Sequence, residues 1–214
     1  MTSGTATRRQ AGRTLQLDEP GKAPGAARRR RTRLTRVSGL AVLVLVVGVV
    51  TGMLLSARPE TGSEAVDATP FTLPMSDGST VSLSDYAGSP VILYFNEGAG
   101  CDSCLLQMAE IEKEPGFAEA GIAVLPIVMN TADQINADRE RLGVEAPFAL
   151  DDGTVSEAYG VLGKGMHAGL PGHGFVLVDA DGVQRWYGNY PSMWLDPAEL
   201  LDIALEHLGG TPVS

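Results

Sequence analysis

The chain has 214 residues, of which 44% are hydrophobic, so it can form one domain of ordinary size with a packed core and still carry further segments. Its net charge of −10 is unevenly spread, because residues 1–36 hold ten basic and two acidic residues whereas the remainder holds six basic and 24 acidic ones. The acidic body excludes a broad nucleic-acid-binding surface on the folded part.

An uncharged segment of 21 residues, 37–57, follows the basic tail. As a helix it is about 30 Å long, which matches the hydrocarbon thickness of a bilayer. The arginine cluster at 28–36 precedes it, which predicts a cytoplasmic N-terminus and an extracytoplasmic position for residues 58–214. We expect residues 1–36 to be a disordered cytoplasmic tail and residues 37–57 an uncleaved transmembrane anchor. A cleaved signal peptide is the alternative.

The rest of the chain predicts a polar linker at 58–68, a folded domain at 69–209 and a short tail at 210–214. The expected elements, in chain order, are a strand pair at 71–83, a helical turn at 83–88, a buried strand at 90–95, a helix at 102–113, a buried strand at 122–129, helices at 131–142 and 156–162, a hairpin at 175–187 and a helix at 197–208. This order predicts an α/β domain with a mixed central sheet flanked by helices.

The chain has two cysteines, Cys101 and Cys104, and both lie in the part expected outside the cytoplasm. A lone pair at this spacing indicates redox chemistry or metal binding, because structural disulfides usually close larger loops. The pair follows a predicted buried strand and opens a predicted helix, whose N-terminal N–H groups favour a thiolate at Cys101. We expect Cys101 to attack disulfides and Cys104 to resolve the mixed disulfide.

Two acidic residues, Glu97 and Asp102, lie close to this pair in the sequence. A carboxylate near a sulfur raises the pKa of the thiol, which favours a reducing or electron-relaying role. If both side chains point into solvent, they leave the thiol unaffected.

Two segments resemble a known family. Residues 71–104 (FTLPMSDGSTVSLSDYAGSPVILYFNEGAGCDSC) resemble the opening of the alkyl hydroperoxide reductase/thiol-specific antioxidant group and of related membrane-tethered thiol–disulfide oxidoreductases. Residues 174–183 (GFVLVDADGV) resemble the later strand–turn–strand of these proteins. The resemblance covers roughly residues 69–209. It implies a thioredoxin-like fold, thiol-based redox or antioxidant chemistry, and no cofactor other than the redox-active disulfide.

The chain departs from the peroxiredoxins of this group in the loop before the first cysteine. Peroxiredoxins share a Pro-x-x-x-Thr-x-x-Cys loop, whereas this chain has Tyr94 and Gly98 at the proline and threonine places. The hydroxyl that would orient a peroxide is therefore absent. Thiol peroxidase activity remains a further alternative.

The segment before the last predicted hairpin holds two candidate auxiliary residues, Pro171 and His173. Related oxidoreductases place a cis-proline ahead of this strand, and Pro171 is the nearest candidate, with a simple tight turn as the alternative. His173 would either tune the Cys101 thiolate or complete a metal site. Copper-delivery proteins of this fold use two cysteines and a later histidine, so the alternative function is copper handling by Cys101, Cys104 and His173.

The main functional prediction is a membrane-anchored, extracytoplasmic thiol–disulfide oxidoreductase that acts through Cys101 and Cys104. Its expected partners are exported protein thiols or disulfides and a second redox protein, because one dithiol exchanges electrons but does not supply them. The anchor at 37–57 makes the bilayer a further partner, and no nucleic acid is expected.

Overall fold

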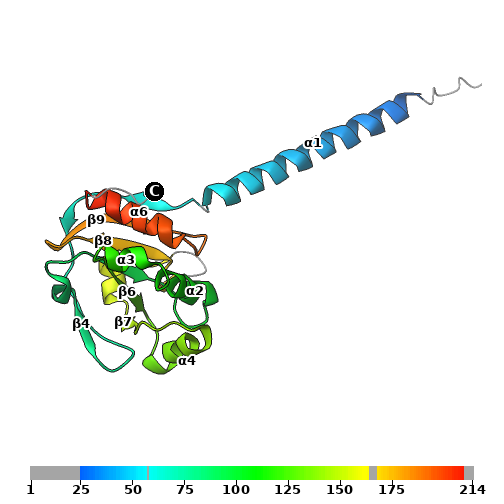
Figure 1. Cartoon of the computed structure of the whole chain (residues 1–214). Helices are drawn as coiled ribbons and strands as arrows, with labels where there is room; N and C mark the ends of the chain where they lie inside the picture. The colour runs from blue at the N-terminus through cyan, green and yellow to red at the C-terminus, as the bar shows by residue number, and fades with distance from the viewer. Residues whose placement is uncertain (1–24, 57, 164–167, 210–214) are drawn as a thin grey trace, which may run out of the picture. The chain divides into compact units, whose positions relative to one another are not determined.

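The computed structural model describes residues 25–56, 58–163 and 168–209. The chain divides into two compact units, residues 1–50 and residues 51–214, and each is described by itself. The first unit is occupied by most of one long helix, α1 (Gly25–Ser56) (Figure 1). Among the residues described, no helix combines the length and the hydropathy that a membrane span requires.

The helix α1 begins further toward the N-terminus than the sequence predicts. Residues 25–36, expected to be disordered, are helical. Alanine and arginine have high helix propensity, and adding a residue to an existing helix costs far less than starting a new one. The rest of the predicted N-terminal tail, residues 1–24, and the predicted tail at 210–214 lie outside the described residues.

The second unit is built on one mixed sheet, as predicted. Its strands are β1 (Glu60–Gly62), β2 (Val66–Asp67), β5 (Val91–Phe95), β6 (Ala123–Val128), β7 (Ala149–Leu150), β8 (Gly174–Val178) and β9 (Val183–Asn189). The order is β1-β9-β8-β5-β6-β7, with β2 also paired to β9. Strand β5 pairs in parallel with β6 and antiparallel with β8. Both neighbours cover its edges, so its backbone groups are satisfied and it forms the centre of the sheet.

The central strand β5 supplies side chains to two cores on opposite faces of the sheet. Its five residues are all buried, and successive side chains alternate between the faces. Ile92 and Tyr94 join the core beneath the helices, whereas Val91, Leu93 and Phe95 join the other core. A strand buried on both faces explains the uninterrupted apolar run in the sequence.

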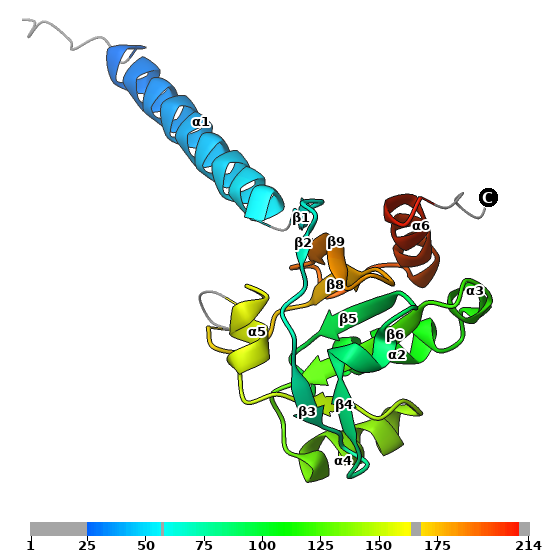
Figure 2. The ribbon, with the colours of Figure 1, turned by 90° about the vertical axis from the view of Figure 1, so that its left-hand side faces the viewer.

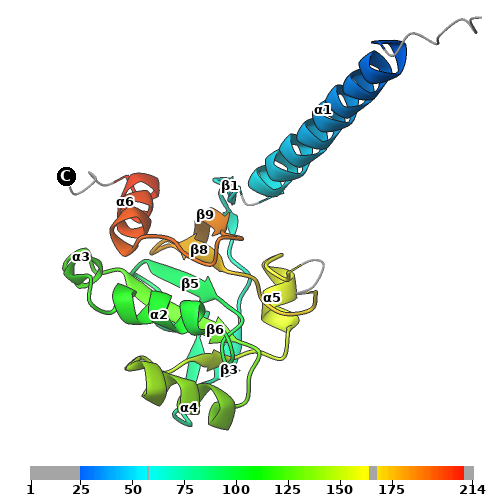
Figure 3. The same cartoon turned by 90° about the vertical axis from the view of Figure 1, so that its right-hand side faces the viewer.

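The two faces of the sheet have different covers, which Figures 2 and 3 show from opposite sides. One core includes residues of the four helices α2 (Asp102–Ile111), α3 (Pro115–Glu119), α4 (Ala132–Leu142) and α6 (Pro197–His207). The other core includes residues of the hairpin β3 (Thr72–Pro74) and β4 (Thr80–Ser82), of the 3₁₀ turn η1 (Leu83–Tyr86) and of α5 (Thr154–Ala158). Tyr94 therefore faces the helix layer, where α2 carries the cysteines.

Three predicted boundaries need correction. The segment predicted as the linker 58–68 contains β1 and β2, which pair antiparallel with β9 and so belong to the domain sheet. Pro115, expected only to end a helix, instead starts α3, because proline suits the first helical turn and Glu114 caps it by accepting from the Gly116 N–H. The helix expected at 156–162 is α5, which begins and ends earlier.

Candidate functional site

The two cysteines form a disulfide at the N-terminus of α2. Strand β5 ends at Phe95, a five-residue loop follows, and Cys101 is the N-cap residue of the helix. The Cα atoms of Cys101 and Cys104 are 5.4 Å apart across the bond. The Cys101 carbonyl accepts from the N–H of Cys104 at 3.0 Å, which closes the first helical turn. The predicted context of the pair, after a buried strand and at the start of a helix, is confirmed.

The two sulfur-bearing residues differ in their access to solvent. Cys104 is completely buried in the core beneath the helices. Cys101 is half-buried and lines an open cleft of about 840 Å³, together with Glu60, Leu162 and Met193. An incoming thiol or disulfide therefore reaches Cys101 first, which is the arrangement expected of an attacking and a resolving cysteine.

The loop before Cys101 is fixed by hydrogen bonds to side chains. Gly98 N–H donates to Asn96 Oδ1 at 3.0 Å, and Ala99 N–H donates to Asn130 Oδ1 at 2.9 Å. Gly98 has φ of +71°, and a Cβ there would collide with Asn130 and Val128. This backbone excludes a threonine at the position, so the departure from the peroxiredoxin loop is a feature of the fold as well as of the sequence.

The charge of Asp102 is balanced by a residue that the sequence analysis did not identify. Arg141 of α4 donates to both carboxylate oxygens of Asp102, at 2.5 and 3.1 Å, and also to Asp138 at 2.9 Å. Asp138 in turn accepts from the Gly100 N–H at 2.9 Å, next to Cys101. The Arg141 hydrogen bond lowers the pKa of Asp102, and the Gly100 N–H followed by Arg141 lowers that of Asp138. The compensated carboxylates therefore disfavour a thiolate less than a bare pair would.

A buried polar pair lies behind the disulfide. Tyr94 Oη donates to the Cys104 carbonyl at 3.0 Å, and the Nδ1 atom of His173 lies 3.2 Å from the same hydroxyl. His173 immediately precedes the strand β8 and is 1% exposed, yet it contributes to the wall of the cleft. Burial lowers its pKa to about 4, so the imidazole is neutral at pH 7.

The remaining predicted auxiliary residues have different positions. Glu97 lies in the loop after β5 and lines the cleft with Cys101. Pro171 is buried and forms an isolated bridge with Leu162, but it is not among the described residues that line the cleft. The structure therefore places Glu97 and His173 in the lining of the cysteine cleft and leaves Pro171 outside that lining.

The predicted copper site is not assembled. In the described part of the chain, no three histidine, cysteine or acidic side chains come together in a way that could hold a metal ion. Both sulfurs are engaged in the disulfide. The copper-handling alternative therefore finds no support in this geometry.

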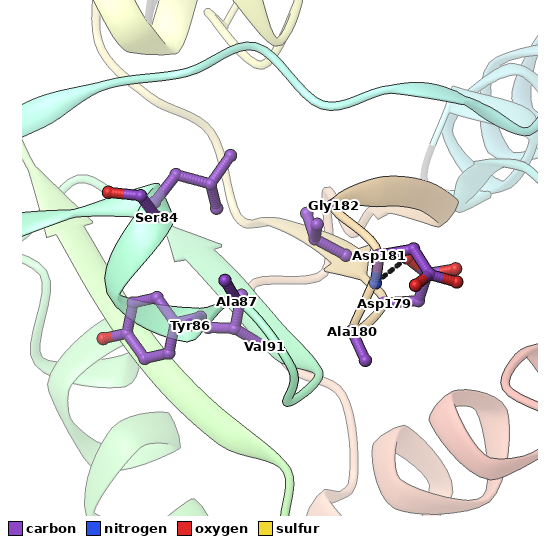
Figure 4. A pocket seen from close by; sticks show the side chains of 10 residues that line it. Ser84, Tyr86, Ala87, Val91, Asp179, Ala180, Asp181 and Gly182 are labelled. Atoms are coloured by element: carbon purple, nitrogen blue, oxygen red, sulfur yellow. Dashed lines mark hydrogen bonds between the residues drawn. The ribbon is translucent and has the colours of Figure 1, made fainter.

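A second, smaller cavity of about 120 Å³ lies between η1 and the turn from β8 to β9 (Figure 4). Asp179 accepts from the N–H of Asp181 at 2.9 Å and from Arg185 Nε at 2.5 Å. These carboxylate contacts build a turn. The described lining residues of this cavity include no cysteine, so the cysteine cleft is the candidate site.

A comparison with known families agrees with this site. The model described as the AhpC/TSA family matches residues 64–187, which is more than half of the chain. The chain belongs to the AhpC/TSA family. It is 34% identical over 118 residues, 52% of this chain and 75% of the relative, to a candidate peroxiredoxin of Mycobacterium tuberculosis (strain H37Rv). It is 31% identical to peroxiredoxin Bcp of Escherichia coli (strain K12), over 52% of this chain and 76% of Bcp.

Solved structures of AhpC/TSA-type proteins share the fold. The crystal structure of peroxidoxin BcpB from Mycobacterium tuberculosis matches with a TM-score of 0.56 and 21% identity, over 69% of this chain and 96% of BcpB. The solution structure of a candidate protein disulfide isomerase from Bacteroides thetaiotaomicron matches with a TM-score of 0.52 and 25% identity. The match covers 67% of this chain and 88% of that protein. The thioredoxin-like α/β fold and thiol-dependent oxidoreductase chemistry follow for this AhpC/TSA-family chain, and this chemistry needs no cofactor beyond redox-active cysteines.

Two site features of this AhpC/TSA-family chain escaped the sequence analysis. Arg141 lies 39 residues from its partner Asp102, and no local pattern links them. Tyr94 carries a weak signal, because it is the one hydroxyl-bearing residue in the apolar run 90–95. A buried hydroxyl needs a hydrogen-bond partner, so a tyrosine in a buried strand indicates that a polar group packs against that strand.

Proposed function

We propose that this AhpC/TSA-family chain is a thiol–disulfide oxidoreductase whose dithiol and disulfide forms interconvert at Cys101 and Cys104. The observation that carries the proposal is the disulfide at the N-terminus of α2, with only Cys101 reaching the cleft. The likeness to a candidate protein disulfide isomerase is consistent with it.

The exchange takes place in two displacement steps. The Cys101 thiolate attacks one sulfur of a substrate disulfide, forms a mixed disulfide and releases the other substrate sulfur as a thiolate. Cys104 then loses its proton and attacks Cys101, which releases the second substrate thiolate and closes the Cys101–Cys104 bond. Two electrons pass from the dithiol to the substrate, and the reverse sequence oxidises a substrate dithiol.

The substrates of this reaction are proposed to be thiols or disulfides of exported proteins. The cleft has a volume of about 840 Å³, and its lining includes the apolar residues Leu162 and Met193, which suits contact with a protein substrate. A separate redox protein then restores the starting form of the dithiol, because the chain carries no second pair of cysteines.

The second candidate is a thiol peroxidase, and the family comparisons favour it more directly, since several relatives are named peroxiredoxins. In that reaction Cys101 thiolate takes one oxygen from a peroxide, which leaves an alcohol or water and a sulfenic acid. Cys104 condenses with the sulfenic acid, releases water and forms the same disulfide. Gly98 disfavours efficient peroxide turnover. It has a left-handed backbone conformation and no side chain that could orient the peroxide.

Trapping the intermediate separates the two candidates. The variant Cys104→Ser keeps the attacking thiol and removes the resolving one, so exchange with a disulfide-bonded substrate stops at a mixed disulfide. We expect mass spectrometry of the full-length variant to find Cys101 linked to the substrate protein, and the wild type to consume no peroxide above a Cys101→Ser control. Rapid, Cys101-dependent peroxide consumption with no mixed disulfide would assign the chain to the second candidate.

The proposed location is the outer side of a membrane, with residues 37–57 as a single-pass anchor. The uncharged stretch and the arginine cluster before it support this proposal. The test is fractionation of cells that express the full-length chain or a chain without residues 37–57. Recovery of both proteins in the soluble fraction would refute anchoring. Protease digestion of intact cells tests the orientation, since residues 58–209 should be cut only if they lie outside.

A further inference from the structure

The residue immediately before β8 carries a buried imidazole that the two exchange steps do not use. His173 is 1% exposed, yet it lines the same cleft as Cys101. The rings of Tyr94 and Phe175 pack against it edge-on, at centroid distances of 5.1 and 5.5 Å. A buried polar ring in the wall of a reactive cleft indicates a chemical role, because an apolar ring would pack there at lower cost.

The hydrogen bonds around Tyr94 leave His173 with a spare acceptor. Tyr94 Oη has one proton, and it donates that proton to the Cys104 carbonyl at 3.0 Å. The hydroxyl can therefore only accept from His173, whose Nδ1 and Nε2 atoms lie 3.2 and 3.4 Å away. In a neutral imidazole one ring nitrogen carries the proton and can donate to Tyr94. The other keeps a lone pair, for which the described part of the chain shows no partner besides the same hydroxyl.

The surroundings keep the imidazole neutral while the disulfide is closed. Burial lowers the pKa of His173 to about 4, and the disulfide itself carries no charge. The titratable and charged groups that face the cleft or pack against His173 are Tyr94 of β5, Tyr190 after β9, Glu60 of β1, Glu97 after β5, and Asp102 of α2 with its partner Arg141. Burial raises the pKa of both tyrosines, so both stay neutral at pH 7.

We propose that His173 is the proton acceptor that converts Cys101 to its thiolate when the disulfide is reduced, with Tyr94 as a positioning residue that holds the imidazole ring. The inference rests on the proposed exchange reaction and names the internal base for it. It also explains together three observations on His173: the burial of its imidazole, its spare lone pair and its place in the same cleft as Cys101.

The reaction balances with a dithiol as the reductant. The partner dithiol gives two electrons to the Cys101–Cys104 bond and becomes a disulfide. Its two protons pass one to Cys104, which becomes a thiol, and one to His173, which becomes an imidazolium opposite the Cys101 thiolate. When Cys101 attacks a substrate disulfide, the imidazolium returns its proton to the departing substrate thiolate.

The two charges stabilise each other by equal amounts. A thiolate in the cleft raises the pKa of His173, and the imidazolium lowers the pKa of Cys101 by the same number of units, as linkage requires. The pKa of His173 should therefore be higher in the reduced chain than in the oxidised one. Cys101 should titrate below the value of about 8.5 that is usual for a free thiol.

The test measures the pKa of Cys101 in the reduced full-length chain, from the pH dependence of its alkylation by iodoacetamide. His173→Gln keeps a hydrogen-bonding group near Tyr94 but cannot take a proton. We expect this variant to raise the Cys101 pKa by at least one unit, which is a tenfold change in the acid dissociation constant of the thiol. His207→Gln, in α6, is the matched control and should leave the pKa unchanged.

The outcomes separate this inference from the proposed function. An unchanged Cys101 pKa in His173→Gln, with reversible disulfide formation intact, overturns the inference and leaves the exchange reaction standing. If no reversible disulfide forms in the wild type, the exchange reaction fails and the inference fails with it. If His173→Gln does not fold, NMR titration of the wild-type imidazole decides, and equal His173 pKa values in the oxidised and reduced chain would overturn the proposal.

Discussion

Arg141 balances the acidic charge near Cys101. It balances Asp102 and Asp138, one of which opens α2 and the other of which holds the Gly100 N–H. Arg141→Gln leaves two uncompensated carboxylates near Cys101, and carboxylates disfavour a thiolate. We expect alkylation of reduced Cys101 at pH 7 to slow by several-fold. Arg141→Lys keeps the charge but loses the bidentate contact with Asp102. Its alkylation rate should therefore lie between those of the wild type and of Arg141→Gln. Equal rates in all three would show that these charges do not reach the sulfur.

The same residues predict a dependence of stability on acid. Arg141 lowers the pKa of Asp102, and the Gly100 N–H followed by Arg141 lowers that of Asp138. A carboxyl whose pKa is lower in the folded state contributes stability above its unfolded pKa, about 3.9, and this contribution is lost as the pH falls through the folded value. Thermal denaturation at pH 7 and pH 3 measures the loss. Arg141→Gln should lower the melting temperature at pH 7 and change it little at pH 3.

Gly98 and Gly100 form a matched pair in the loop before Cys101. Both have positive φ, +71° and +93°, but a Cβ at Gly98 would collide with Asn130 and Val128, whereas Gly100 has nothing within 4 Å. Gly100→Ala should cost only backbone strain, roughly 1 kcal/mol, and Gly98→Ala should cost clearly more, since packing must also shift. Chemical denaturation measures both. Equal losses would mean that the Asn130 contact does not constrain the loop.

At the scale of single residues, the sequence predicted the place of the cysteine pair and several of its neighbours, but not the contacts that those neighbours make. Cys101 and Cys104 were predictable because their spacing, the apolar run before them and the helical pattern after them are all local. The contacts Tyr94–His173 and Asp102–Arg141 join residues 79 and 39 positions apart, and only the folded chain brings them together. The sequence left open whether Asp102 points into solvent, and the structure shows that it is exposed but paired with Arg141.

At the scale of the elements, α4 begins with a two-way capping box. Thr131 Oγ1 accepts from the Gln134 N–H, and Gln134 Oε1 accepts from the Thr131 N–H. Because α4 carries Asp138 and Arg141, the cap supports the cysteine loop as well as the helix. Thr131→Ala should lower the free energy of unfolding by about 1 kcal/mol, and Thr131→Ser, which keeps the oxygen, by much less. A loss of the same size in both variants would show that the hydroxyl does not act as a cap.

The long elements were predictable, as were the hairpin β3–β4 and the turn η1, but three short strands were not. Strands β5 and β6 appear as apolar runs, and α4 ends at Gly143, whose φ of +72° is the left-handed conformation that glycine favours. Strands β1, β2 and β7 have two or three residues each, which is too short for a period to show. Their conformation comes from pairing with β9 and β6, which is a tertiary effect.

At the scale of the whole molecule, the sequence was sufficient for the fold class and the family. The alternation of strands and helices, the C-x-x-C position and the resemblance at 71–104 led to a thioredoxin-like domain, and the AhpC/TSA match over 64–187 agrees. The charge difference between the basic tail and the acidic body is what a chain with parts on the two sides of a membrane would have. The anchor at 37–57 stays a prediction. Electron flow depends on the difference in potential between the dithiol and its partner, which a single chain does not encode.

The most direct test is an equilibrium redox titration of the full-length chain, in a series of glutathione or dithiothreitol buffers, with peroxide consumption followed in parallel. We predict a reversible two-electron transition that belongs to Cys101 and Cys104, is absent from Cys101→Ser and Cys104→Ser, and occurs without peroxide turnover. Its midpoint potential would give the direction of electron flow. Failure to form the disulfide at any redox potential of the buffer series would contradict the account. So would peroxide turnover by Cys101 in the absence of Cys104.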